Sequence, residues 1–251
     1  MYLFTTPKTN IDVPASGLFT RRLLSLSQRS TEKLESHSES SGPLTLILKK
    51  QAHVADIITG GQDTVGLRIP NHPLTLQLLK EFDGAVCAPS ANKFGRISPT
   101  SANHVLEELE DVSVLDGGDC QIGIESTILD LSGDNPCLLR PGHISKEKLE
   151  NILNTEVSLP QSHSPRVSGS LASHYAPVTE TQLISKTDIL NLSDDNELGL
   201  LCFDAFEFKH LNVKQLSDNP EYYAHDLYAK LRELDKLNLK CIYIEAVPDT
   251  P

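Results

Sequence analysis

The sequence predicts an α/β protein with two domains, and three observations support this. Apolar runs of strand length alternate with stretches of helical periodicity from Gly42 onward. A segment rich in Pro, Ser and Gly, residues 158–178, interrupts the alternation as a linker between domains does. A smaller set of strands around one long helix follows this segment.

Residues 1–41 differ from the rest of the chain. They carry scattered apolar residues without a sustained period and a serine-rich stretch, SLSQRSTEKLESHSESS. A segment that cannot bury much apolar surface does not fold stably, so we expect residues 1–41 to be divergent and poorly ordered.

The first domain, residues 42–157, is expected to be a mixed sheet with helices. Short apolar runs that end at turn residues predict its strands, which are 44–48, 64–69, 84–88, 112–116, 125–131 and 136–140. Apolar residues at helical spacing predict helices over 73–82 and 145–153, the second capped by Ser145. A third helix is expected with Ser98 as its N-cap and Pro99 as its first residue.

The second domain, residues 179–251, is expected to be a smaller α/β unit. Strands are predicted at 181–185, 198–203 and 241–247, and a helix starts at Pro220. A strand, a helix and a strand of these lengths form a βαβ unit. Because the sequence stops directly after a strand, we expect this domain to be incomplete.

Composition limits the classes of function. The formal net charge of −12 argues against a broad nucleic-acid surface, which needs clustered Lys and Arg. The sequence shows no apolar run of membrane-spanning length and no secretory signal, so a cytoplasmic protein without a membrane partner is expected. The five cysteines are widely spaced, which favours buried thiols over disulfides, and the histidine spacing predicts no protein metal site.

Polar residues at the ends of predicted strands are the candidate site. Arg68 either pairs with an internal acid or binds a carboxylate or phosphate, and Arg140 is either an anion ligand or part of a surface ion pair. Ser90, Asn92 and Ser98 are either loop and cap residues or ligands, and Ser126 lies at a strand edge or in a site. Thr64 and His72 are weaker candidates. Together these residues describe a cleft for a molecule with phosphates and a carboxylate.

Several motifs resemble those of a known family. GPLTLIL, TVGLRIPNHP, APSANKFGRISPTSANHV, GGDCQIGIESTILDLS and LLRPGHI resemble, in order, the YrdC-like domain of threonylcarbamoyl-AMP synthases. SPRVSGSLASHYAP resembles the linker of the long, two-domain members, and YAHDLYAKLRELDKLNLKCIYIEAVPD resembles their Rossmann-like C-terminal domain. The resemblance implies a YrdC-like mixed twisted sheet followed by a smaller Rossmann-like domain.

The resemblance also implies an activity. The family forms threonylcarbamoyl-AMP and pyrophosphate from L-threonine, bicarbonate and ATP, and the product serves tRNA threonylcarbamoyladenosine modification through further pathway proteins. Substrate positioning is expected rather than a catalytic side chain, with Mg²⁺ bound to the ATP phosphates. The implied L-threonine ligands are Arg68, Ser90 and Ser126. The implied ATP ligands are Thr64, Ala88, Ser98, Arg140 and Tyr175, of which Tyr175 covers the nucleotide from the linker.

The N-terminal segment departs from the family pattern. Residues 1–41 contain no segment like the family's P-T-E-T and K-x-R motifs, so we expect a first domain that is truncated at its N-terminus. The alternative function is therefore a catalytically impaired relative that binds a nucleotide or, weakly, RNA, or an inactive fragment.

Overall fold

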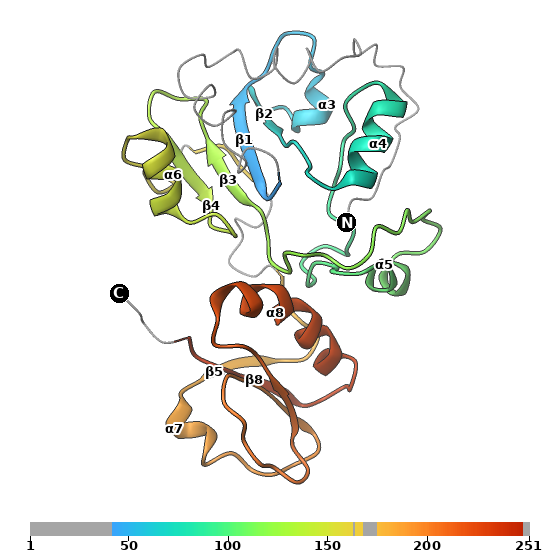
Figure 1. Ribbon diagram of the computed structural model, residues 1–251, viewed down its shortest axis with the longest axis vertical. Coiled ribbons are helices and arrows are strands. Elements are labelled where there is room, and N and C mark those ends of the chain that lie inside the picture. Colours follow the sequence, from blue (N-terminus) through green and yellow to red (C-terminus); the bar gives the residue numbers. More distant parts are fainter. Residues whose placement is uncertain (1–41, 163, 168–174, 248–251) are drawn as a thin grey trace. The chain divides into compact units, whose positions relative to one another are not determined.

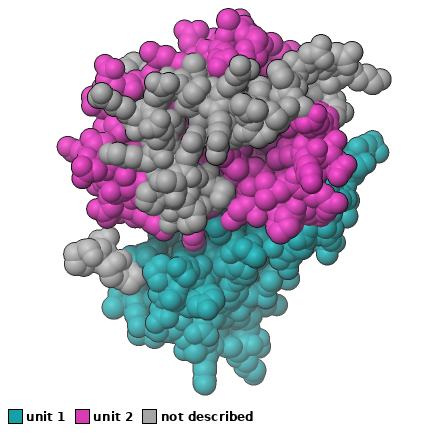
Figure 2. Space-filling model, turned by 45° about the horizontal axis from the view of Figure 1, so that its top comes forward, with its two compact units in different colours: residues 1, 91–124, 172–251 teal, residues 2–90, 125–171 magenta. Residues whose placement is uncertain are grey.

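The computed structural model describes residues 42–162, 164–167 and 175–247 (Figure 1). The predictions for residues 1–41, for part of the linker and for the last four residues lie outside this range. The described chain forms two compact units, coloured separately in Figure 2. The units are not successive stretches of sequence: unit 2 contains residues 42–90 and 125–167, and unit 1 contains residues 91–124 and 175–247.

Unit 2 is built on a four-stranded mixed sheet with the order β2-β1-β3-β4. Its strands are β1 (Leu44–Lys49), β2 (Thr64–Leu67), β3 (Thr127–Asp130) and β4 (Cys137–Arg140). β1 runs antiparallel to β2 and parallel to β3, and β3 runs antiparallel to β4. The predicted mixed sheet is confirmed. Its topology places the end of β2, the start of β3 and the end of β4 at the same end of the sheet.

The core of unit 2 follows from the alternation of side chains along β1. Leu44, Leu46 and Leu48 point to one face and pack with α6 (Lys146–Leu153), whereas Ile47 packs on the opposite face. Ser145 accepts a hydrogen bond from the backbone N–H of Lys148, so the predicted N-cap of α6 is confirmed. Unit 2 also contains α3 (Asp56–Thr59), which sequence analysis missed, and the predicted helix α4 (Pro73–Phe82).

Three expected elements differ from the structure. Residues 84–88 and 112–116 are described but form no strand. The helix expected from Ser98 is α5 (Ala102–Glu108), and its N-cap is Ser101, which accepts a hydrogen bond from the backbone N–H of His104. Ser98 and Pro99 therefore precede the helix. Because residues 97, 99 and 100 are all buried, packing keeps this stretch out of the helix although its local sequence favours an earlier cap.

Unit 1 contains a second four-stranded sheet, with the order β5-β8-β6-β7 and every pair parallel. The strands are β5 (Thr181–Ile184), β6 (Leu198–Cys202), β7 (Asn212–Gln215) and β8 (Cys241–Glu245). The helices are α7 (Lys186–Ile189) and α8 (Pro220–Asp235), in addition to α5. The predicted βαβ unit is confirmed, whereas α7 and the edge strand β7 were not predicted.

Both faces of the unit 1 sheet are covered, as a parallel sheet requires. The neighbouring residues Leu200 and Leu201 point to opposite faces, and both are buried. Leu201 packs with the apolar stripe of α8, and Leu200 packs with Ile189 of α7. Figure 1 shows α8 lying across the sheet.

The cysteines are all free thiols, but they are not all buried. Cys137, Cys202 and Cys241 are buried as expected, whereas Cys87 is exposed. Burial and the neighbouring carboxylates of Glu245 and Asp204 raise the pKa of Cys202 to about 11. The described residues include no helix with the length and apolar character that crossing a bilayer requires.

Candidate active site

Arg68 and Ser126 come from distant parts of the sequence and are joined by a hydrogen bond. Nη1 of Arg68 donates to Oγ of Ser126 at 2.6 Å, and Nε donates to the carbonyl oxygen of Gly42 at 2.7 Å. Arg68 directly follows β2 and Ser126 directly precedes β3, so both residues lie at the same end of the sheet. The Arg68 residue is exposed, whereas only 8% of Ser126 is exposed. A solvent-accessible guanidinium group beside a hydroxyl group is suited to binding a carboxylate.

Arg140, at the end of β4, contacts the backbone of the same serine. Its Nε and Nη2 donate to the carbonyl oxygen of Ser126 at 3.0 and 2.9 Å, and Nη2 lies 3.4 Å from Oε2 of Glu125. The two arginines therefore bind one residue, Arg68 through its hydroxyl and Arg140 through its carbonyl. The Glu125 carboxylate neutralises part of the charge of Arg140, which weakens Arg140 as a ligand for an anion.

A turn after β4 holds this arrangement in place. Thr127 is fully buried; its Oγ1 donates to the carbonyl oxygen of Ile144 at 2.9 Å and accepts from the Ile144 backbone N–H at 2.9 Å. Gly142 approaches so closely that a Cβ there would lie 2.5 Å from the Glu125 carbonyl oxygen. The LLRPG motif thus needs glycine at 142 because the backbone of Glu125–Thr127 fills the space of a side chain.

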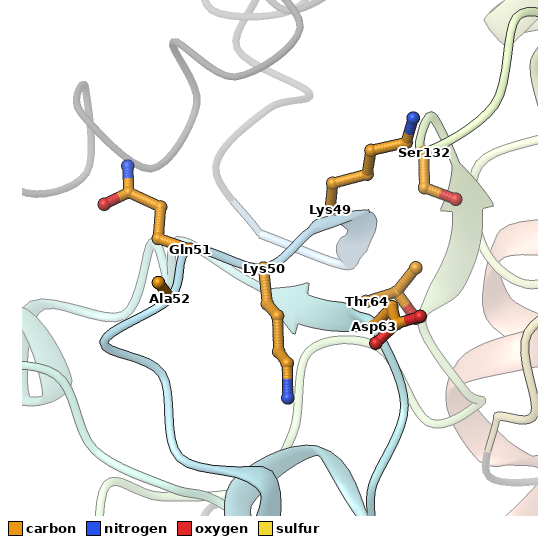
Figure 3. A pocket seen from close by; sticks show the side chains of 7 residues that line it. All are labelled: Lys49, Lys50, Gln51, Ala52, Asp63, Thr64 and Ser132. Atoms are coloured by element: carbon orange, nitrogen blue, oxygen red, sulfur yellow. The ribbon is translucent and has the colours of Figure 1, made fainter.

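A pocket of about 450 Å³ lies at the opposite end of the unit 2 sheet, where β1 ends and β2 begins (Figure 3). Its lining residues are Lys49, Lys50, Gln51, Ala52, Asp63, Thr64 and Ser132. The volume falls in the range of small-molecule sites, and one of the two lysines in the lining, Lys50, is paired with Asp56. Thr64 precedes Arg68 by four positions, which is about 13 Å along a strand. The structure therefore separates Thr64 from the Arg68–Ser126 pair.

The remaining predicted ligands are distributed over both units. Ala88 and Ser90 are exposed in the unit 2 segment that follows α4. Ser98 is half-buried in unit 1. Tyr175 also belongs to unit 1, where its ring stacks on Tyr228 of α8 with centroids 6.2 Å apart. The described Tyr175 ring thus faces α8, and its role as a cover over the nucleotide stays a prediction.

His104 lies close to the Ser98 stretch and was not singled out by sequence analysis. The backbone N–H of Thr100 donates to Nδ1 of His104 at 3.2 Å. Burial lowers the pKa of His104 below its usual 6.5, and the positive charges of Arg232 and Lys236 lower it further. The neutral ring is therefore favoured, which leaves Nδ1 able to accept this hydrogen bond.

Two family models match consecutive parts of the chain. The first, described as "Telomere recombination" and covering Sua5, YciO and YrdC proteins, matches residues 20–142. The second, described as the C-terminal domain of threonylcarbamoyl-AMP synthase, matches residues 144–251. The first match begins inside the N-terminal segment that was expected to be divergent.

Individual relatives agree with these models. The threonylcarbamoyl-AMP synthases of Pyrococcus abyssi and Bacillus subtilis are 33% and 35% identical to this chain, and each match covers 83% of the chain. The chain spans 66% of the length of each of these relatives. The crystal structure of P. abyssi Sua5 with L-threonine matches with a TM-score of 0.78 and 31% identity, over 94% of this chain and 74% of that one. The chain belongs to the threonylcarbamoyl-AMP synthase family.

Membership of the threonylcarbamoyl-AMP synthase family confirms the resemblance and the fold class predicted from the motifs. The structure brings Arg68, Ser126 and Arg140 together, as their places at strand ends suggested, while the ligand assigned to each residue stays a prediction. Sequence analysis allowed an ion pair at Arg140 but did not identify its partner, Glu125. Its one signal was the presence of a carboxylate and a guanidinium at the ends of two strands that later proved to be neighbours.

Proposed function

We propose that this protein is a threonylcarbamoyl-AMP synthase, which converts L-threonine, bicarbonate and ATP into threonylcarbamoyl-AMP and pyrophosphate. The hydrogen-bonded Arg68–Ser126 pair carries the proposal, because it offers a carboxylate site in a chain whose relative was solved with L-threonine. The product serves threonylcarbamoyladenosine formation in tRNA, in the cytoplasm, through proteins that transfer the threonylcarbamoyl group.

The site residues act by positioning. Arg68 binds the threonine carboxylate, with Ser126 beside it and Ser90 completing the contacts. The threonine nitrogen bonds to the bicarbonate carbon with loss of water, and a carbamate oxygen then bonds to the α-phosphorus as the bond to the pyrophosphate oxygen breaks. Thr64, Ala88, Ser98, Arg140 and Tyr175 are the proposed nucleotide ligands. Mg²⁺ enters with ATP and neutralises charge on the phosphates.

Threonine binding is the direct test. Isothermal titration calorimetry with L-threonine should show binding to the wild-type chain. Arg68→Lys and Ser126→Ala should weaken it about tenfold or more, because each removes a charge-assisted hydrogen bond or its partner. Arg166→Lys is the matched control: it lies in the same unit, and the Gln62 side chain contacts only its backbone.

Pyrophosphate release distinguishes the two candidate functions. Release that depends on threonine, bicarbonate and ATP together supports the synthase. Threonine binding without release supports the impaired relative instead. Absence of threonine binding in the wild-type chain, or equal binding by wild type and Arg68→Lys, contradicts the proposal.

A further inference from the structure

The stretch that carries Ser98 is packed onto the C-terminal part of unit 1. We call residues 91–101 the Ser98 segment. Ile97, the residue before Ser98, is only 2% exposed and belongs to the core cluster formed by Leu231 and Leu234 of α8 with Ile242 of β8. A residue next to a proposed ATP ligand is therefore a core residue of the Rossmann-like sheet and its helix.

Arg232 of α8 binds the backbone on both sides of Ser98. Its Nη2 donates to the carbonyl oxygen of Ile97, and its Nε donates to the carbonyl oxygen of Ser98 at 3.3 Å. These carbonyls belong to the two peptide groups that flank the Ser98 α-carbon. Fixing both peptide planes fixes the direction in which the Ser98 side chain leaves the backbone.

Glu108 of α5 completes the contact. Its Oε2 lies 2.7 Å from Nη2 of Arg232, and both side chains are only 11% exposed. Its Oε1 accepts a hydrogen bond from the backbone N–H of Lys93 at 2.7 Å. The carboxylate thus orients the guanidinium and also holds the start of the Ser98 segment. Breaking such a shielded ion pair is more disruptive than breaking an exposed one.

A further contact holds the middle of the segment. The backbone N–H of Ala176 donates to the carbonyl oxygen of Gly95 at 3.0 Å, and Ala176 forms a parallel β-bridge with Arg96. The neighbouring residue Tyr175 stacks on Tyr228 of α8. The Ser98 segment is therefore fixed to α8 both directly and through the end of the linker.

We infer that Arg232, oriented by Glu108, is a positioning residue for ATP binding: it holds the backbone around Ser98 and so makes nucleotide affinity depend on α8. The inference rests on the proposed function, because Ser98 is an ATP ligand only within it. It assigns to the C-terminal part of the chain a role in the nucleotide site that involves no contact between Arg232 and the substrate.

The test separates nucleotide affinity from threonine affinity. Arg232→Lys keeps the positive charge beside Glu108 but lacks the planar fork that reaches both carbonyls. It should weaken MgATP binding about tenfold and leave L-threonine binding within about twofold, since the proposed threonine ligands lie in unit 2. Lys236→Met is the matched control, because it removes the exposed ion pair between Glu107 and Lys236, the C-cap residue of α8.

A second measurement does not depend on substrates. Amide hydrogen exchange of residues 93–101 should accelerate in Arg232→Lys and stay unchanged in Lys236→Met. Unchanged MgATP affinity or unchanged exchange in Arg232→Lys overturns the inference, as does an equal loss of threonine binding. If wild type binds neither ligand, the proposed function fails, whereas the exchange experiment still decides whether Arg232 holds the Ser98 segment.

Discussion

Thr127→Val is expected to loosen the turn that supports the Arg68–Ser126 pair. The substitution keeps the shape of a fully buried side chain but removes the hydroxyl that both donates to and accepts from the Ile144 backbone. A buried backbone donor and acceptor left unpaired cost about 1–3 kcal/mol each, and the added methyl group returns about 1 kcal/mol. The net loss in the free energy of unfolding should be about 1–5 kcal/mol.

Hydrogen exchange of unit 2 measures this loss without assuming that both units unfold together. At about 1.4 kcal/mol per factor of ten, the slowest amides of β1 and β3 should exchange roughly 5–4000 times faster in Thr127→Val. Those of β6 and β8 in unit 1 should not change. Thr127→Ser keeps the hydroxyl and should cost only about 1 kcal/mol for the lost methyl group. If Thr127→Val exchanges as slowly as Thr127→Ser, the hydroxyl does not hold the turn and the reasoning is refuted.

Three other predictions concern single residues. Gly142→Ala should weaken L-threonine binding in a calorimetric titration, because the added Cβ would collide with the backbone that precedes β3. Gly133→Ala is the control: open space surrounds this position, so the variant should bind L-threonine as wild type does. As pH falls below about 6.5, the free energy of unfolding of unit 1 should decrease, because His104 takes up a proton more readily in the unfolded chain than in the folded one. Urea titrations at several pH values measure this decrease, which should be absent in His104→Gln. A thiol reagent at about pH 8 should modify Cys87 rapidly and Cys202 only after unfolding, which mass spectrometry of the labelled peptides would check; equal rates would contradict the burial of Cys202.

The sequence predicted the elements whose signal is local. α6 and α8 combine an N-cap or an N-terminal proline with an apolar stripe, so periodicity and capping chemistry agree. β7 was missed because Lys214 and Gln215 interrupt its apolar pattern, which an edge strand tolerates. The start of α5 was misplaced because both Ser98 and Ser101 are acceptable caps; the choice between them depends on the burial of Ile97, which no local pattern reveals.

The candidate site shows the same division. Arg68 and Arg140 were recognisable because a guanidinium at the end of an apolar strand needs a partner. Their shared partner, Ser126, follows from strand order, which was not available before the sheet was known. The contact of Arg232 with the backbone at Ser98 joins residues 134 positions apart, and an arginine on a helix surface carries no sign of such a partner.

The interleaving of the two units has a consequence for synthesis on the ribosome. Ile97 precedes Arg232 by 135 positions, and its core neighbours in α8 and β8 are translated at about that distance or later. At about 5–20 residues per second, a ribosome needs roughly 7–27 s to make that stretch, and until then Ile97 lacks its core neighbours in α8 and β8. The side chain of Ile97 is therefore exposed to solvent in the nascent chain, although β1 and β3, the strands on both sides of it in the sequence, are already able to pair. Premature termination before α8 would leave Ile97 permanently exposed. The last third of the message therefore decides whether the segment between β1 and β3 packs into a core or stays exposed to solvent.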